Sequence, residues 1–171
     1  MQLTIKDRVM LANQYQILAR LDESESEHYL EKVKILTNGY SYLYDSLKIN
    51  FCQEMTYDEG KFVFDILALY ELIEDVKRKT QHEKIINHRY GYFNGFCGNY
   101  ETAYMSLCNF FVNVQNKFPT QKKYFSKNDG MNSHLPMIEK YKKMIDIYSS
   151  IRNDALFYEL TVEQTLSILE A

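Results

Sequence analysis

The stretch that decides the fold is TYDEGKFVFDILALYELIEDVKRK, residues 56–79. Thr56 precedes Glu59 by three residues, the spacing of a capping box, in which each side chain bonds the backbone N–H of the other residue at a helix start. The apolar residues that follow run almost all the way round a helix: Phe62, Val63, Phe64, Ile66, Leu67, Leu69, Tyr70, Leu72, Ile73 and Val76. Such a helix needs neighbours on nearly every side, so we predict a central, buried helix over residues 57–79.

Other capping signals place further helices on both sides of this one. Three more pairs have the capping-box spacing, namely Thr4 with Asp7, Ser24 with Glu27 and Thr161 with Gln164. The first pair predicts a helix that ends near residue 21. The second predicts a helix that ends near residue 38, where Gly39 can adopt the left-handed conformation of a C-cap, and the third predicts a terminal helix. We expect Ile5, Val9, Tyr15 and Leu18 to form the buried face of the first helix.

The rest of the chain completes an all-α pattern. We predict a short tyrosine-rich helix over 40–49, a helix over 100–118 capped by Asn99, and a helix that begins near Pro136 after a polar loop over 119–134. No segment shows the sustained alternation of apolar and polar residues that is typical of a strand. The sequence therefore predicts a multihelical single domain over residues 1–171, with about seven helices around the helix at 57–79. A division into subdomains 1–80 and 81–171 is a variant of this prediction.

Composition favours a folded protein inside the cell. The chain of 171 residues is 46% hydrophobic and has six glycines and two prolines, so it has ample apolar material for a core and few helix breakers. No stretch approaches the roughly 20 consecutive apolar residues that span a bilayer. Lys6, Asp7 and Arg8 stand where a secretory signal needs an apolar run. We therefore expect a cytoplasmic protein that does not bind membranes.

The net charge of −3 hides a segregation along the chain. Residues 1–76 carry a net charge of −7, residues 77–143 carry +8 and residues 144–171 carry −4. Such asymmetry can mark an anionic partner, but patches of opposite sign can also meet within one fold or between identical subunits. The basic middle of the chain therefore has two candidate partners, another copy of the chain or an anion.

Several short stretches of sequence, spread over nearly the whole chain, match a known family in the same order. They are LANQYQILARLD (11–22), NGY (38–40), Asp65, Ile66 and Tyr70 in the long helix, FNGF (93–96) with Glu101, FFVNV (110–114) and NSHLPMIEKYKKM (132–144). With these blocks the chain resembles the YfbU-like family of uncharacterised bacterial helical proteins. The resemblance implies a multihelical fold and self-association, and it supplies no agreed catalytic residues.

The basic, aromatic middle of the chain is the strongest candidate for a binding site. Cations neutralise phosphates, and aromatic rings stack on unpaired bases, so this composition fits RNA or single-stranded nucleic acid. The candidate binding residues are Lys77, Arg78, Lys79, Arg89, Tyr90, Tyr92, Phe93, Phe96, Lys122, Lys123 and His134. A helical core can also absorb many of the 25 Phe and Tyr residues, which is the structural alternative.

Two carboxylates are candidates for acid/base catalysis. Asp65 lies among apolar positions of the central helix, and a buried carboxylate needs a partner. If the loop at 93–99 packs on that helix, Asp65 and Glu101 could form a pair with separated pKa values. The structural alternative is an ion pair between Asp65 and Arg89 or another basic residue.

The remaining motifs give no metal, cofactor or nuclease signature. His82, His88, His134 and Cys97 do not have the spacing of a metal site, and Cys52, Cys97 and Cys108 contain no C-x-x-C pair, so we expect reduced thiols, no metal and no cofactor. The segment RNDALFY (152–158) resembles the start of the R-x4–6-H motif of HEPN ribonucleases, which are also helical. Tyr158 stands where that motif needs its histidine, so we interpret the match as a coincidence.

We predict on these grounds a non-enzymatic, homo-oligomeric interaction protein, in which the acidic and basic regions help subunits to dock. The first alternative is an RNA or single-stranded nucleic-acid binding or processing protein that uses the basic aromatic middle. The second is a small-molecule enzyme that uses Asp65 and Glu101.

Overall fold

The computed structural model describes residues 2–47, 53–152 and 159–171. Within these ranges the chain forms helices and turns, and an isolated bridge between Phe96 and Asn132 is the sole β pairing. The predicted all-α class is confirmed. Residue contacts divide the chain into two compact units, Met1–Gln53 and Glu54–Ala171, called the N-terminal unit and the C-terminal unit below.

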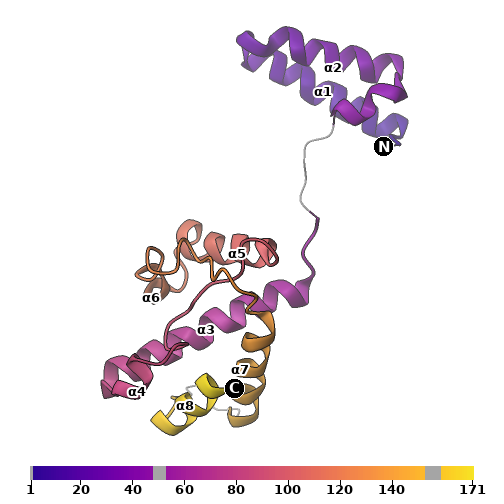
Figure 1. Ribbon diagram of the computed structural model, residues 1–171. Helices are drawn as coiled ribbons and strands as arrows, with labels where there is room; N and C mark the ends of the chain where they lie inside the picture. The colour runs from indigo at the N-terminus through magenta and orange to yellow at the C-terminus, as the bar shows by residue number, and fades with distance from the viewer. Residues whose placement is uncertain (1, 48–52, 153–158) are drawn as a thin grey trace. The chain divides into compact units, whose positions relative to one another are not determined.

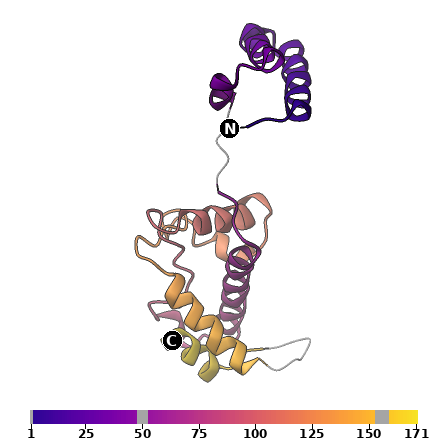
Figure 2. The same ribbon diagram turned by 90° about the vertical axis from the view of Figure 1, so that its right-hand side faces the viewer.

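The N-terminal unit is built on two helices that lie side by side, α1 (Ile5–Leu21) and α2 (Ser26–Asn38) (Figure 2). The capping box of Thr4 and Asp7 is present, and Gly39 ends α2 in the left-handed region with a φ of 70°. Short 3-10 helices, η1 (Glu23–Glu25) and η2 (Ser41–Leu47), precede and follow α2. The buried cluster of this unit is Ala12, Tyr15, Val33, Ile35, Leu36, Tyr44 and Leu47.

Three local predictions for this unit differ from the structure in whole or in part. Ser24 does not form a capping box with Glu27, because its hydroxyl donates to Asp22 Oδ1 at 2.7 Å and α2 begins only after η1. The tyrosine-rich segment is a 3-10 helix over Ser41–Leu47, and residues 48–49 lie outside the described ranges. The buried face of α1 contains Tyr15 as predicted, but Ile5, Val9 and Leu18 are exposed. The small side chains of Ala12 and Ala19 are buried instead, and they let α1 and α2 approach closely.

The C-terminal unit is organised around α3 (Tyr57–Thr80), the predicted central helix. The capping box of Thr56 and Glu59 is present. α5 (Thr102–Asn109) and α6 (Pro119–Lys122) pack on one side of α3, and α7 (Ile138–Ile151) and α8 (Val162–Glu170) on the other (Figure 1). Side chains from several faces of α3 are therefore buried, including Val63, Ile66, Leu67, Leu69, Tyr70, Ile73 and Val76.

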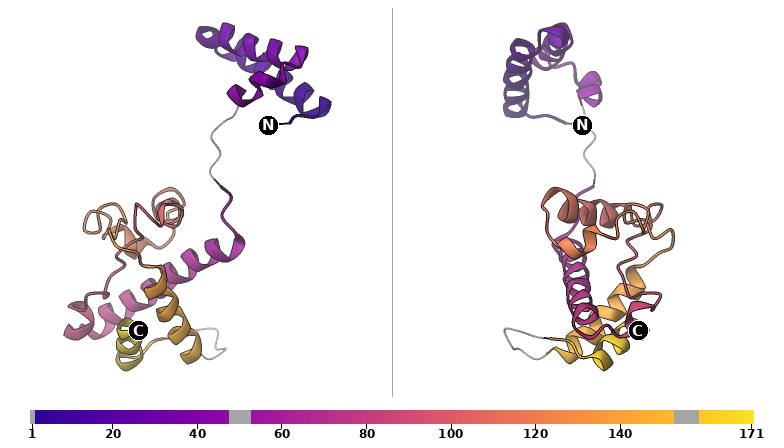
Figure 3. Two further views of the ribbon diagram at one scale, coloured as in Figure 1. Left: turned by 45° about the vertical axis from the view of Figure 1, so that its right-hand side comes forward. Right: turned by 90° about the vertical axis from the view of Figure 1, so that its left-hand side faces the viewer.

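The other helices of this unit depart from the prediction in detail. The predicted helix over 100–118 is α5 followed by a π-helix, η3 (Phe110–Val114), and Asn99 does not cap it, because a turn in which Glu101 N–H bonds Cys97 O leads into α5. The predicted loop over 119–134 contains α6, and a further short helix, α4 (Glu83–Ile86), follows α3. The capping box of Thr161 and Gln164 starts α8 as predicted, and α8 lies beside α7 (Figure 3).

A close backbone approach holds the irregular segment 88–99 in place. Phe96 N–H bonds Met131 O at 2.9 Å, and Ser133 N–H bonds Phe96 O at 3.1 Å. Gly95 has a φ of +91°, and a Cβ atom at this position would lie 2.0 Å from Met131 O. Only glycine fits there, so the backbone of 95–96 can lie directly against that of 131–133.

The division between the two units falls after residue 53 and not after residue 80. The reason is that α3 contributes the core of the C-terminal unit and packs with α5, α6, α7 and α8. A single domain over 1–171 stays a prediction. None of the helices in the described ranges combines the length and the apolar character that a membrane span requires.

Candidate functional site

A buried carboxylate, Glu74 on α3, anchors the site. Lys77 and Lys123 donate to its two oxygens at 2.5 Å each, and the Tyr124 hydroxyl donates to Oε1 at 2.7 Å. Burial raises the pKa of Glu74, but the hydrogen bonds from Lys123, Lys77 and Tyr124 outweigh it, so the pKa lies below its usual value. Glu74 is therefore ionised at neutral pH. Lys77 also donates to Gly91 O at 2.9 Å, so this network ties α3 to the segments around residues 91 and 124.

Two stacked tyrosines, Tyr92 and Tyr124, lie next to this network. Tyr124 stacks on Tyr92 with 5.3 Å between the ring centroids and 29° between the planes. The ammonium group of Lys127 lies 4.1 Å from the Tyr92 centroid, and that of Lys123 lies 4.9 Å from the Tyr124 centroid. Burial, together with the hydrogen bond to ionised Glu74, raises the pKa of Tyr124. Its hydroxyl is therefore protonated at neutral pH, and it acts as a hydrogen-bond donor.

Two hollows adjoin at this tyrosine pair, and they are called the paired hollows below. The first, of about 440 Å³, is lined by Lys77, Arg78, Lys123 and Tyr124, among others. The second, of about 320 Å³, is lined by Arg89, Tyr90 and His134, among others. Tyr92 and Lys127 line both. The surface therefore offers aromatic rings and cations along a continuous path.

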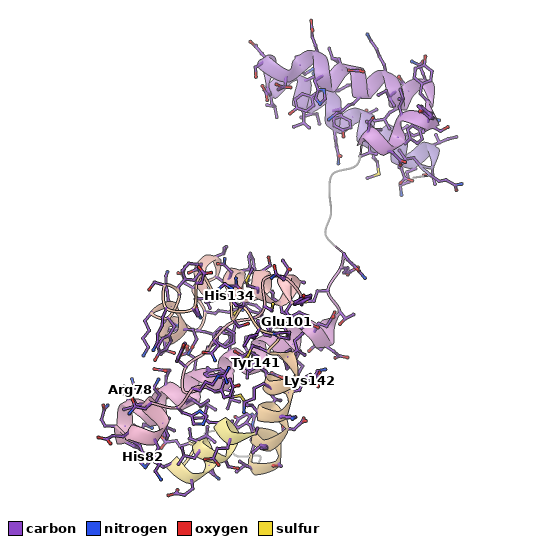
Figure 4. The ribbon with its side chains drawn as sticks, viewed as in Figure 1. Arg78, His82, Glu101, His134, Tyr141 and Lys142 are labelled. Carbon is purple, nitrogen blue, oxygen red and sulfur yellow. The ribbon has the colours of Figure 1, made fainter. Side chains whose placement is uncertain are left out.

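Seven of the eleven predicted binding residues lie on this surface. Lys77, Arg78, Arg89, Tyr90, Tyr92, Lys123 and His134 line one hollow or both. Arg78 and His134 stand far apart in the view of Figure 4, Arg78 near the end of α3 and His134 in the turns before α7. Arg78 is paired with Asp75 at 2.8 Å in an exposed contact on α3.

The structure removes four of the predicted residues from this surface. Phe93 and Phe96 are fully buried and pack on Tyr141, because the core around α3 needs their rings. Lys79 pairs with Glu159 at 2.7 Å, and Lys122 donates to Asn116 Oδ1 at 3.2 Å. Neither of these lysines lines the paired hollows.

With this geometry established, sequence comparison places the chain in a family. The YfbU domain matches residues 1–171. The chain belongs to the YfbU family. It is 44% identical to a UPF0304 protein of Methanocaldococcus jannaschii over 167 residues, which cover 96% of this chain and 97% of that protein. It is 27% identical to a UPF0304 protein of Actinobacillus succinogenes over the full length of both. These names describe no activity.

The two candidate catalytic carboxylates of this YfbU protein have separate partners. Asp65 forms an ion pair with Lys61, one turn earlier on α3, and not with Arg89. Glu101 is buried, and its oxygens accept the backbone N–H groups of Cys97, Met137 and Ile138 at 2.8 to 3.0 Å. It lies close to the start of α7 (Figure 4), where the helix dipole favours a negative charge. These contacts favour structural roles for both carboxylates.

Other sequence motifs contribute little to the site. Within residues 2–47, 53–152 and 159–171, no group of three or more His, Cys, Asp or Glu side chains could hold a metal ion. Cys97 and Cys108 are buried, free thiols. Cys52 and residues 153–158 of the HEPN-like segment lie outside the described ranges.

Sequence reasoning missed Glu74 and Lys127. Glu74 is one of several acids on α3, and its burial follows only from the approach of residues 123–124, about 50 positions later. Lys127 lies three residues after Tyr124, and a series of turns brings it over the rings. The clustering of lysines with tyrosines in KKYFSK (122–127) is the one signal that could have indicated this part of the surface.

Proposed function

We propose that this YfbU protein is a non-enzymatic interaction protein that forms homo-oligomers through the outer face of α1. The observation that carries the proposal is that α1 is apolar on two opposite faces. One face holds buried Ala12 and Ala19. The other presents Met10, Ile17 and Leu21, which are 51%, 57% and 77% exposed and are called the outer seam. A surface helix normally places polar residues opposite its core face, so an exposed apolar seam favours an interface.

The spacing of the outer seam favours another helix as its partner. Its residues are 7 and 4 positions apart, and at 100° per residue they lie within about 40° of one another around the helix. With Gln14 between them, the spacing is 4-3-4, as in the seam of a coiled coil. A second α1 presents the same spacing, and two-fold pairing places identical seams face to face. We therefore assign the seam to a second copy of this chain.

A second apolar feature lies on the side of α1 that faces away from the seam. Ile5 and Val9 are 77% and 54% exposed, and with Ala12 and Leu36 they line a hollow of about 400 Å³ between α1 and α2. This hollow lies on the Ala12 side of α1 and is therefore a separate surface from the outer seam.

The charge segregation contributes less to docking than the sequence suggested. Glu74 binds Lys77 and Lys123, and Asp75 binds Arg78, so part of the opposite charge is neutralised inside the C-terminal unit. We therefore expect apolar contact to carry self-association, and salt to weaken it little.

A matched pair of variants tests this proposal by light scattering and sedimentation velocity at micromolar protein. The double variant Ile17→Glu with Leu21→Glu changes the net charge by −2 and is expected to be a monomer. The control Lys34→Glu changes the charge equally at an exposed position of α2 and is expected to assemble like the wild type. Wild-type association is expected at both about 0.05 and 0.5 M salt.

Two results would contradict the proposal. One is a wild-type monomer at both salt concentrations. The other is a double variant whose mass equals that of the wild type while its hydrodynamic radius increases. That outcome would mean that the C-terminal unit of the same chain, and not a second copy, covers the seam.

A further inference from the structure

The cations that line the paired hollows fall into two groups. Lys77 and Lys123 bind Glu74, and Arg78 binds Asp75, so these three serve the protein itself. Lys127 and Arg89 are exposed and have no carboxylate partner in the described part of the chain; their charged groups lie over tyrosine rings. These two side chains can therefore bind an anion without breaking an ion pair of the fold.

The rings beside these cations are half-buried tyrosines. Tyr92 stands between the hollows, Tyr124 stacks on it, and Tyr90 lies in the second hollow with the Arg89 guanidinium 5.4 Å from its centroid. A base of any kind can stack on such a ring, and cations next to stacking platforms are the combination that binds single strands. From this geometry we infer that the paired hollows bind single-stranded nucleic acid, with bases at Tyr92 and Tyr90 and phosphates at Lys127 and Arg89.

The distribution of charge favours a strand over a lone phosphate. Each hollow contains few cations that are not already paired with a carboxylate, so a single phosphate group binds there only weakly. A strand can contact Lys127 and Arg89 at the same time and therefore binds more tightly. The lining of the two hollows is basic on balance: it contains five Lys and Arg and three acids, which are Glu74, Asp75 and Asp129. This field attracts a polyanion.

The shape of the surface favours unpaired bases. The hollows of about 440 and 320 Å³ are each in the size range of small-ligand sites, and they adjoin, so successive nucleotides can occupy them in turn. Half-buried rings reach a base only when that base is turned out of a duplex. We therefore expect duplexes to bind more weakly than single strands.

Fluorescence anisotropy with a labelled oligouridylate of about ten nucleotides tests the inference on the full chain. Binding should weaken as salt rises, and Lys127→Ala and Arg89→Ala should each weaken it and reduce the slope of log K against log salt by about 0.7. Tyr92→Leu should weaken binding about 5- to 100-fold, whereas Tyr92→Phe, which keeps the ring, should bind like the wild type.

The N-terminal unit supplies a matched control. Lys32 lies 5.1 Å from the ring of Tyr15, which stacks with Tyr29 at 6.3 Å, so Lys32→Ala removes one charge beside the same kind of tyrosine pair. This variant should bind the oligonucleotide like the wild type.

Each of several outcomes would overturn the inference. These are no binding by the wild type at low salt, equal losses for Lys127→Ala and Lys32→Ala, and equal binding of a duplex of the same length. Displacement of the oligonucleotide by inorganic phosphate at the same total phosphate concentration would also overturn it, because the surface would then bind a lone anion.

Discussion

The two units of this protein differ in how much of the apolar surface of their main helix is buried. α1 in the N-terminal unit buries one face and leaves Met10, Ile17 and Leu21 exposed, whereas α3 in the C-terminal unit buries side chains around much of its circumference. The difference lies in the neighbours. α1 packs mainly on α2, whereas α3 has α5, α6, α7 and α8 around it. A unit of about 50 residues buries a smaller share of its surface on folding than a larger unit does, so more of its apolar side chains stay exposed.

The two stacked tyrosine pairs show the same contrast. Tyr15 of the N-terminal pair is buried in the core of its unit, and Lys32 lies over it from outside. Tyr92 and Tyr124 of the C-terminal pair are half-buried and line the paired hollows. The combination of stacked rings with a lysine therefore does not define a binding site by itself; the hollow beside the rings makes the difference.

Glu101→Ala tests how far the C-terminal unit depends on its internal polar contacts, and it has the largest expected effect. It leaves the buried N–H groups of Cys97, Met137 and Ile138 without an acceptor, which should lower the free energy of unfolding by about 4 kcal/mol. Urea unfolding measures this loss. Hydrogen exchange should show faster exchange in α3 and α7 and unchanged exchange in α1.

An effect below about 1 kcal/mol would mean that water replaces the carboxylate, and that Glu101 is no structural lock. The control is Glu139→Ala, which removes an exposed carboxylate paired with Lys142 and should change stability by less than about 0.5 kcal/mol.

Glu74→Gln should lower the stability of the C-terminal unit by about 3 kcal/mol at neutral pH, because it breaks a buried ion pair. The pKa of Glu74 in the folded state lies below its usual value of 4.5, so its stabilising effect is complete above about pH 4.5 and is lost as the pH falls through the folded pKa. Urea unfolding from pH 7 to pH 3 should therefore show the gap between wild type and variant closing in acid.

The matched control lies on the same helix. Asp65→Asn removes the charge of the more exposed ion pair with Lys61 and should change stability by less than about 0.5 kcal/mol. A gap for Glu74→Gln that stays constant with pH would show that packing, and not charge, explains its effect.

Two of the three capping boxes, one from each unit, have the same chemistry and give the smallest of these losses. Thr4→Ala and Thr56→Ala should each cost about 1 kcal/mol. Because contacts divide the chain after residue 53, we expect hydrogen exchange to quicken in α1 for the first variant and in α3 for the second. If either variant loosened both units equally, the chain would behave as one cooperative domain.

Local patterns were sufficient for much of the helical framework. The capping boxes at Thr4, Thr56 and Thr161 and the apolar circumference of residues 57–79 involve residues three or four positions apart, so they are legible without the fold. The same logic failed at Ser24, where a nearby acceptor, Asp22, took the hydroxyl. It also failed for the buried face of α1, because alanines allow closer packing than larger residues do.

The candidate site could be predicted only in part. Composition indicated a basic, aromatic middle, and seven of the predicted residues do line the paired hollows. Phe93 and Phe96 could not be separated from Tyr90 and Tyr92 by sequence, because neighbouring aromatic residues in an irregular segment have no periodicity that tells core from surface.

The sequence by itself determined an all-α protein with a buried central helix and a basic, aromatic middle, because helix capping and apolar periodicity act over one or two turns. Tertiary structure alone decided which charges are paired within the fold and which are not. The turns between α5 and α7 contain positive φ angles at Asn116, Phe118, Asp129, Met131 and His134. Their path brings Lys123 and Tyr124 to Glu74 and leaves Lys127 over Tyr92, and long-range contacts of this kind leave no periodic trace in a sequence.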